Sequence, residues 1–288
     1  MNYRHGFHAG NHADVLKHVV LLGLLAALQR KDGALFVLDT HAGRGRYPLQ
    51  GHEATRTAEA AGGIARLLAA FGRSSPPAIA RLLEAVREQN PDGALRSYPG
   101  SPLLIARALR EQDRLACCEL QSDEAGALQA LLGRDPRIGV HRRDGYAALT
   151  ALLPPAQKRG LVLVDPPYEA QLAEFDAALA GLRAALGRWP NAVYALWYPI
   201  KLRRSLGSFF RRAATLPAQQ ALVAELLVRA DDSPLRMNGS GMLLLNPPWQ
   251  YERELEATLP VLRDALQEDA GGSWRLDWLR RETAGGGR

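Results

Sequence analysis

The segment Gly160-Leu161-Val162-Leu163-Val164-Asp165-Pro166-Pro167-Tyr168 joins an apolar run to a turn that contains two prolines. A short apolar run that ends at turn residues predicts a strand buried on both faces, as in a parallel sheet. In an open α/β sheet, ligands bind beyond the carboxyl ends of such strands. The segment therefore predicts both the sheet and a candidate site at residues 165–168.

The rest of the chain alternates apolar runs with helical patterns, which is typical of a doubly wound α/β fold. We expect a first helix over residues 14–30 and a return to helix from Trp249 onward. The predicted parallel strands cover residues 35–39, 115–119, 138–141, 160–164 and 192–197, and a closing antiparallel pair covers 221–228 and 242–245. The sequence thus predicts a mostly parallel sheet of seven strands.

A helical insertion is predicted between the first two strands. Residues 52–89 have no strand pattern and are typical of two amphipathic helices separated at Ser74-Ser75-Pro76-Pro77. Such an insertion is either a substrate-facing subdomain or an ordinary covering layer, and the sequence leaves both open. After it, Tyr98-Pro99-Gly100-Ser101-Pro102 predicts a helix start, with Ser101 as the cap and Pro102 in the first turn.

The composition indicates a folded protein of a reducing compartment. The chain has 288 residues, 47% of them hydrophobic, which is enough for a sizeable core. Its two cysteines, Cys117 and Cys118, are adjacent, so we expect reduced thiols in a buried strand. The longest apolar run, residues 19–28, is shorter than the roughly 20 residues of a membrane span. With a polar N-terminus, these features predict a cytoplasmic protein with no membrane partner.

The net charge has two interpretations. A formal charge of +6 and a high isoelectric point favour a polyanionic partner such as nucleic acid. Most of the basic residues are arginine, however, and alanine and glycine are abundant, a composition that a GC-rich genome also produces. Charge alone does not decide between them.

Polar residues follow three further predicted strands and suggest a nucleoside ligand. Asp39 and His41 follow the first strand, Glu119 ends the second and Asp144 follows the third. Between strand and helix, Gly43-Arg44-Gly45 lets a ligand approach the backbone, and no phosphate-binding Walker pattern is present. Glu119 suits the two hydroxyls of a ribose, and Asp144 suits an adenine amino group. Taken singly, each acid is better explained as a solvated strand end, and a tight turn explains the glycines equally well. Together, on successive strand ends after a glycine loop, the acids favour a bound cofactor.

The segment 165–168 has the chemistry to hold an exocyclic amine. Such an amine is a poor nucleophile because its lone pair is delocalised into the ring. The Asp165 carboxylate and the Pro166 carbonyl can accept its two hydrogens, and the prolines fix the backbone that carries this carbonyl. Tyr168 can stack on an extruded base, so that positioning supplies much of the rate. The competing interpretation is a structural proline turn.

A second segment, Asn246-Pro247-Pro248-Trp249, has the same loose pattern after an apolar strand. Two more predicted strands and long helical stretches separate it from Asp144. Asp165 follows Asp144 after one helix and one strand, so we assign the catalytic loop to Asp165.

The sequence resembles the bacterial ribosomal RNA large-subunit methyltransferase J family over nearly its whole length. The resemblance rests on the segments 3–18 (Tyr3-Arg4-His5-Gly6-Phe7-His8-Ala9-Gly10-Asn11-His12-Ala13-Asp14-Val15-Leu16-Lys17-His18), 38–43, 98–102, 165–168, 195–199 and 241–249. It implies a Rossmann-like class I domain, for which we predict residues 1–51 and 96–283, with an inserted helical subdomain at 52–95. Residues 284–288 are a Gly-rich tail that we expect to be disordered.

By the same resemblance, the protein uses S-adenosylmethionine to methylate N6 of one adenine in 23S rRNA, which is free or in an early precursor particle. The implied catalytic residues are Asp165, Pro166 and Tyr168. The residues implied to bind S-adenosylmethionine are His18, His41, Ser101, Glu119, Asp144, Gly145 and Asp165. Tyr3 and Arg4 are expected to meet the RNA. No metal is expected, because His5, His8, His12 and His18 lack a metal-ligand pattern, and we expect a monomer.

Three alternatives remain for this sequence: a DNA adenine methyltransferase, a protein glutamine methyltransferase, and an inactive RNA-binding module. For RNA binding we expect Lys17 and Arg44 to flank the opening of the site. Arg56, Arg66, Arg73 and Arg81 of the insertion are either phosphate contacts or a solvated surface.

Overall fold

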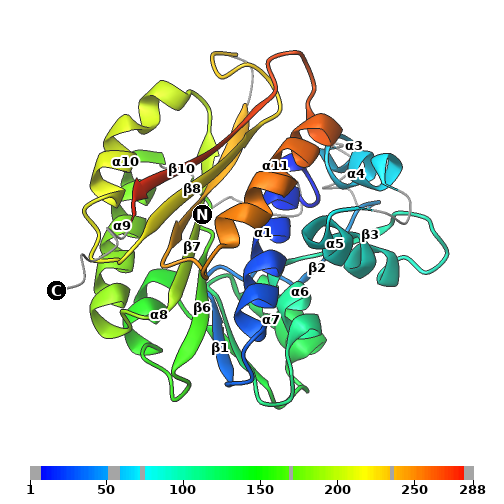
Figure 1. Ribbon diagram of the computed structural model, residues 1–288. Coiled ribbons are helices and arrows are strands. Elements are labelled where there is room, and N and C mark those ends of the chain that lie inside the picture. Colours follow the sequence, from blue (N-terminus) through cyan, green and yellow to red (C-terminus); the bar gives the residue numbers. More distant parts are fainter. Residues whose placement is uncertain (1–7, 51–58, 72–74, 169–170, 234–236, 282–288) are drawn as a thin grey trace.

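The computed structural model describes residues 8–50, 59–71, 75–168, 171–233 and 237–281. The main sheet has the order β10-β8-β9-β7-β6-β1-β4-β5, in which the five strands from β7 to β5 are parallel and β9, β8 and β10 are antiparallel (Figure 1). The strand bounds are β1 Leu35–Asp39, β4 Arg114–Glu119, β5 Ile138–Arg142, β6 Arg159–Val164, β7 Val193–Ile200, β8 Ala221–Leu227, β9 Gly239–Leu245 and β10 Ser273–Arg280.

The predicted α/β fold is therefore confirmed, but the predicted number of strands was wrong. The seven predicted strands are present, and β10 is an eighth, at the edge of the sheet beside β8. The return to helix after Trp249 holds only for α11, Tyr251–Leu266. Residues of β10 alternate irregularly between half-buried and exposed, so its strand character depends on pairing with β8 rather than on a clear local pattern.

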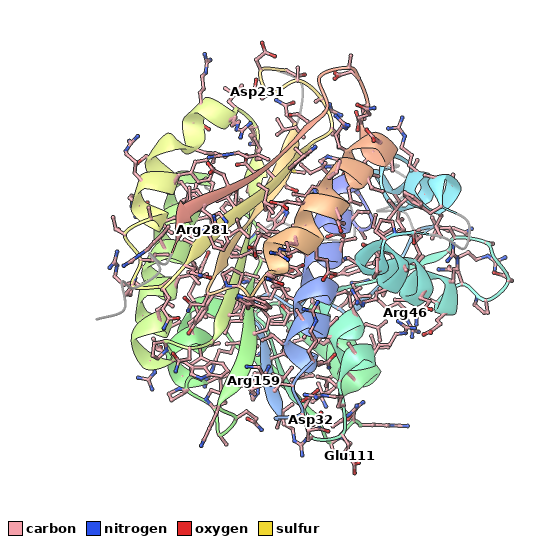
Figure 2. The ribbon with its side chains drawn as sticks, viewed as in Figure 1. Asp32, Arg46, Glu111, Arg159, Asp231 and Arg281 are labelled. Carbon is pink, nitrogen blue, oxygen red and sulfur yellow. The ribbon has the colours of Figure 1, made fainter. Side chains whose placement is uncertain are left out.

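Helices cover both faces of the sheet, as the alternation of side chains in β6 requires. Leu161 and Leu163 pack under α1, α6, α7 and α11, whereas Val162 and Val164 pack under α8, α9 and α10. Figure 2 shows side chains filling both layers. The helix bounds are α1 His12–Gln29, α3 Glu59–Gly62, α4 Ile64–Ala70, α5 Pro77–Glu88, α6 Ser101–Ala108, α7 Ser122–Leu132, α8 Gly145–Ala151, α9 Gln171–Arg188, η2 Arg203–Leu206, α10 Gly207–Ala213 and α11 Tyr251–Leu266.

Two features of the core agree with the sequence. Helix α1 is long and apolar enough to cross a membrane, but 89% of it is buried inside the fold, as expected for a core helix. It begins at His12, two residues before the predicted start, because the Asn11 side chain accepts hydrogen bonds from the Ala13 and Asp14 amides. The adjacent Cys117 and Cys118 are free thiols buried on opposite faces of β4.

The described part of the insertion is helical and packs against α1 and α11. Two short strands, β2 (Arg46–Pro48) and β3 (Ser97–Pro99), pair with each other where the chain enters the insertion and where it returns to the main domain. Instead of one helix before the predicted break there are two, α3 and α4, separated at Gly63. The Gly63 backbone is so close to Gly10 that a Cβ there would lie 2.1 Å from the Gly10 carbonyl oxygen. This close contact fixes the insertion on the segment that directly precedes α1. The boundaries of the subdomain remain a prediction.

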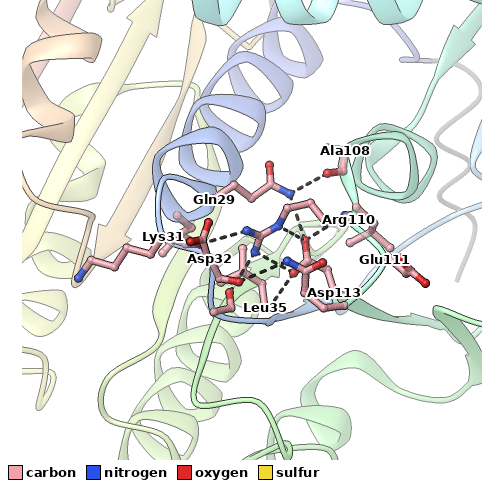
Figure 3. A network of polar contacts seen from close by, with 12 residues as sticks. Gln29, Lys31, Asp32, Leu35, Ala108, Arg110, Glu111 and Asp113 are labelled. Carbon is pink, nitrogen blue, oxygen red and sulfur yellow. Dashed lines mark hydrogen bonds and ion pairs between the residues drawn. The ribbon is translucent and has the colours of Figure 1, made fainter.

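Asp113 lies at the amino-terminal ends of the parallel strands, where it forms a network of polar contacts (Figure 3). Its fully buried carboxylate accepts hydrogen bonds from the Leu35 amide at 2.9 Å and from the Arg110 guanidinium at 2.9 and 3.0 Å. Gln29, at the end of α1, donates to the same group. Burial by itself would raise the pKa of Asp113, but these donors outweigh it and leave the pKa below its ordinary value.

We expect Asp113→Ala to lower the free energy of unfolding by about 1–3 kcal/mol, because buried donors lose their acceptor. Since the folded-state pKa is depressed, the carboxylate contributes its stability above the unfolded pKa, and this is lost as the pH falls through the folded pKa. Urea titrations of both proteins at pH 7 and in acid should therefore show a difference that shrinks in acid. Asp176→Ala, which breaks an exposed pair with Arg212, is the control without effect. If the difference in free energy of unfolding between the parent protein and Asp113→Ala does not change with pH, the stabilising role of the Asp113 carboxylate is contradicted.

Candidate active site

Two cavities open side by side at the carboxyl ends of the parallel strands. The first, of about 300 Å³, lies over β1, β4 and the start of α8, and the second, of about 560 Å³, lies over β7 and the start of α1. Lys17, Asp165 and Pro167 line both. The predicted catalytic segment is therefore at the boundary between two separate binding spaces.

The glycine loop and Glu119 form one wall of the first cavity. Gly43 has a φ of +59°, and a Cβ there would lie 2.0 Å from the Tyr47 hydroxyl, so only glycine fits. The Gly43 amide donates to Glu119 Oε2 at 2.9 Å, and the Gln121 amide donates to Oε1 at 2.7 Å. Burial raises the pKa of Glu119. Each carboxylate oxygen keeps a second lone pair for a ligand hydroxyl.

His41 and Gly145 form the opposite wall. Burial lowers the pKa of His41 to about 4, so its ring is neutral at pH 7. Its Nδ1 lies 2.8 Å from the Thr40 hydroxyl, which donates to the Leu163 carbonyl. A Cβ on Gly145 would lie 2.2 Å from the Thr40 carbonyl oxygen. Asp144 caps α8 by accepting from the Ala147 amide at 2.8 Å, and this cap fixes its carboxylate at the cavity.

All the predicted cofactor-binding residues line the first cavity: His18, His41, Ser101, Glu119, Asp144, Gly145 and Asp165. Ser101 was expected to cap α6, but Gly100 is the cap and Ser101 is the first helical residue, without a side-chain cap bond. Its buried side chain belongs to the cavity instead. Sequence reasoning missed further lining residues, among them Thr40, Tyr47, Leu120, Gln121, Glu124, Tyr146 and Glu174.

Lys17 connects the two cavities through a buried ion-pair network. Its Nζ lies 2.5 Å from Asp165 Oδ2 and 2.8 Å from Asp14 Oδ1, and its side chain is only 4% exposed. Burial alone would lower the pKa of Lys17, but the two carboxylates outweigh it and raise the pKa above its usual range. Lys17 was expected to flank the opening of the site; it lines both cavities, and its ammonium is directed at Asp165.

Aromatic side chains form the floor of the second cavity. Tyr168, with a φ of 50°, donates from its hydroxyl to the Trp197 carbonyl at 2.9 Å. The Tyr168 and Trp197 rings meet edge to face, with centroids 5.7 Å apart. Both line the cavity, and Tyr168 is 8% exposed. Pro166 is buried and is not among the residues that line either cavity, whereas Pro167 lines both.

The similar segment at Asn246 is structural. Leu245, at the end of β9, pairs with Tyr194 near the start of β7, so Asn246 lies at the opposite edge of the sheet from Asp165. Its side chain accepts from the Gln219 amide and donates to the Pro190 and Ala192 carbonyls. Asn246 therefore links two turns of the chain by hydrogen bonds. The assignment of the catalytic loop to Asp165 agrees with the topology.

The basic residues proposed for RNA contact are largely engaged within the protein. Arg44 pairs with Glu124 at 2.6 Å, and Arg81 pairs with Glu254 at 3.2 Å. Arg66 donates to backbone carbonyls at the end of α11. Arg66 and Arg81 thus hold the insertion against α11 while their side chains stay at least partly exposed, and a contact of these residues with RNA remains a prediction. Tyr3, Arg4, His5, Arg56, Arg73 and the tail 284–288 lie outside the described residues.

Within the described ranges, no group of three or more His, Cys, Asp or Glu side chains is arranged to hold a metal ion.

The family model described as "Ribosomal RNA large subunit methyltransferase D, RlmJ" matches residues 32–280. The chain is 38% identical to the ribosomal RNA large subunit methyltransferase J of Haemophilus influenzae, over 98% of this chain and 100% of that protein. It is 39% identical to the protein of the same name from Escherichia coli, over 97% and 99%. A crystal structure of a Legionella pneumophila protein, 32% identical, superposes with a TM-score of 0.86 over 94% of this chain and 98% of that one.

These matches extend over nearly the full length of both partners, and they include the strands and loops that line the two cavities. The family resemblance seen in the sequence is thereby confirmed, and this chain belongs to the ribosomal RNA large subunit methyltransferase J family.

Proposed function

We propose that this protein transfers a methyl group from S-adenosylmethionine to N6 of an adenine in 23S rRNA, in the cytoplasm. The observation that carries the proposal is the meeting of two cavities at Asp165 and Pro167. Methyl transfer needs a donor and an acceptor that approach each other at one point from separate binding spaces. The names of the relatives supply the class of substrate, and the residues at the junction supply the amine chemistry.

The first cavity suits S-adenosylmethionine. Gly43 and Gly145 let the backbone pack closely against Tyr47 and Thr40, and this packing shapes the walls of the cavity. We assign the ribose hydroxyls to Glu119 and the adenine amino group to Asp144, and place His18, neutral His41 and Ser101 around the rest of the cofactor. The cofactor supplies an electrophilic methyl group on a sulfonium, and no residue has to form a covalent bond.

In this proposal the segment 165–168 positions the amine. Lys17 holds Asp165 Oδ2, which leaves Oδ1 to accept one hydrogen of the amine. The Pro166 carbonyl accepts the other hydrogen, so the nitrogen lone pair is directed at the methyl group. Tyr168, held by the Trp197 carbonyl, presents a fixed aromatic wall to the base. Orientation of this kind can supply a large part of the rate enhancement. Tyr3 and Arg4 remain our predicted RNA contacts.

The test is methyl transfer from labelled S-adenosylmethionine, followed by digestion and nucleoside mass spectrometry. The acceptors are protein-free 23S rRNA and precursor particles from cells that lack the corresponding enzyme, with duplex DNA and a glutamine-containing peptide as the alternatives. We expect label in N6-methyladenosine from RNA alone. Label only in DNA or peptide would replace the proposed substrate, and cofactor binding with no acceptor would favour the inactive RNA-binding module.

Glu119→Ala should weaken S-adenosylmethionine binding by about 1–3 kcal/mol, roughly 5- to 150-fold, because the ribose loses charge-assisted hydrogen bonds and the Gly43 amide loses its acceptor. Calorimetric titration of the folded variant measures the effect. Glu84→Ala, on the exposed face of α5, is the matched control and should bind like the parent protein. If Glu119→Ala binds the cofactor with unchanged affinity, the ribose assignment is wrong.

A further inference from the structure

The second cavity contains a buried histidine that the proposed chemistry does not use. His12 is the first residue of α1, is 8% exposed and lines this cavity together with Asp165 and Trp197. Its Nδ1 is buried and has no hydrogen-bond partner in the part of the chain that the structure describes. Buried polar groups without partners are rare and costly, and this one indicates which ring nitrogen carries the proton.

The position of the ring proton follows from this. A buried N–H without an acceptor costs more than a buried lone pair without a donor, since orphaned N–H groups are the rarer case. The proton therefore belongs on Nε2, and Nδ1 is left unprotonated. The structure has no hydrogen bond from Nε2 to a described residue, and Nε2 is not among the fully buried unpaired atoms as Nδ1 is, so it is the ring nitrogen available to the cavity that the ring lines. His12 thus offers the cavity one neutral hydrogen-bond donor.

The surroundings keep His12 neutral. Burial lowers its pKa to about 4, opposed by the charge of Glu268 and reinforced by that of Arg229. Arg229 and Glu268 form an ion pair with each other and line the same cavity. Their charges largely compensate, so the ring does not acquire a proton at neutral pH. A neutral donor of this kind discriminates between nucleobases, because bases differ in which ring nitrogens are acceptors.

The helix sets the spacing between His12 and the reacting amine. His12 and Lys17 are five residues apart on α1, which is about 7.5 Å along the helix axis. The Lys17 ammonium donates to Asp165, the residue that holds the amine in the proposed function. A purine whose N6 lies at Asp165 and whose ring occupies the second cavity would have His12 among the residues around it, because both residues line that cavity. In adenine, N1 is bonded to the carbon that bears N6, and N7 is bonded to the neighbouring ring carbon, so the two nitrogens lie on either side of the amino group. Both are acceptors.

We propose that His12 is a specificity-determining residue whose Nε2 donates a hydrogen bond to a ring nitrogen of the target adenine, N1 or N7. The inference rests on the proposed function and adds to it the group that reads the base. The N1 of guanine carries a hydrogen and cannot accept, so contact with N1 would reject guanine directly. Contact with N7 would leave the discrimination to the groups that hold N6.

The experiment combines a variant with modified RNA. The probe is a synthetic RNA hairpin around the adenine identified by mass spectrometry, with 1-deazaadenosine, 7-deazaadenosine or adenosine at that position. His12→Phe keeps a planar ring without a donor, His12→Asn restores a donor, and His141→Phe on the distant strand β5 is the matched control. Cofactor affinity and the unfolding temperature are measured for each variant.

We expect His12→Phe to lower kcat/KM on the adenosine hairpin roughly 10- to 100-fold with unchanged cofactor affinity. One deaza substitution should cause a similar loss in the parent protein and no further loss in His12→Phe, and His12→Asn should recover part of the activity. Such coupling does not arise from a structural role.

Full activity of His12→Phe, or equal losses with both deaza hairpins in parent and variant, would overturn the role of His12 while leaving the proposed function intact. If His12→Phe does not fold, the test uses the parent protein and His12→Asn. If neither deaza substitution lowers kcat/KM in these two proteins, the inference is overturned. If the parent protein methylates none of the RNAs, both the proposed function and the role of His12 are overturned.

Discussion

Asp165→Asn is expected to lower the rate of methyl transfer at least about 100-fold, with the fold retained. The substitution keeps the size of the side chain but replaces a charged acceptor, held at Oδ2 by Lys17, with a neutral amide. Removal of a single preorganised group that acts in the transition state commonly costs 10²- to 10³-fold in kcat. Single-turnover experiments with labelled cofactor measure the rate of methyl transfer in the parent protein and in the variant.

Asn246→Ala is the matched control, because it changes the first residue of the similar Asn-Pro-Pro segment at the other edge of the sheet. Its side chain makes hydrogen bonds with two backbone amides and two carbonyls, and its φ of 52° suits asparagine better than alanine. We expect a loss of stability of about 1–3 kcal/mol and normal turnover by the folded fraction. An inactive Asn246→Ala beside an active Asp165→Asn would show that the wrong loop was chosen.

The parallel strands could be predicted because their signal is local. Leu35–Asp39 and Arg159–Val164 are apolar runs bounded by turn residues, and the structure places them at or within one residue of the predicted limits. The acids at the strand ends were found for the same reason, since topology brings carboxyl ends together at one edge. Strand β10 lacks such a pattern, because it is an edge strand whose formation depends on β8.

The contacts of the site could not be predicted, because they join residues far apart in the sequence. Lys17 and Asp165 are separated by 148 positions, and nothing near Lys17 distinguishes it from a surface lysine. The same holds for Gly63, whose backbone contact with Gly10 divides the insertion into α3 and α4. Asp14 and Lys17, three residues apart on α1, were the one local sign that a charged pair shares a helix face.

Lys17→Met should be the most disruptive substitution at the junction of the cavities. Methionine keeps the length of the side chain but leaves two carboxylates, Asp14 and Asp165, near each other without the cation between them; their side chains are 3% and 13% exposed. Breaking a buried ion pair by removing one partner commonly costs about 3–5 kcal/mol. We therefore expect a large fall in the free energy of unfolding, measured by urea titration, and a large fall in kcat.

The two effects can be separated by the double variant Lys17→Met/Asp14→Asn. Removing the Asp14 charge relieves the repulsion between the carboxylates, so stability should return in part. Asp165 would still lack the ammonium that holds Oδ2, so methyl transfer should stay low if the lysine positions this carboxylate. Recovery of both stability and activity would mean that Lys17 serves only to neutralise Asp14. Low activity in a stable double variant would identify Lys17 as the residue that positions Asp165 for the amine.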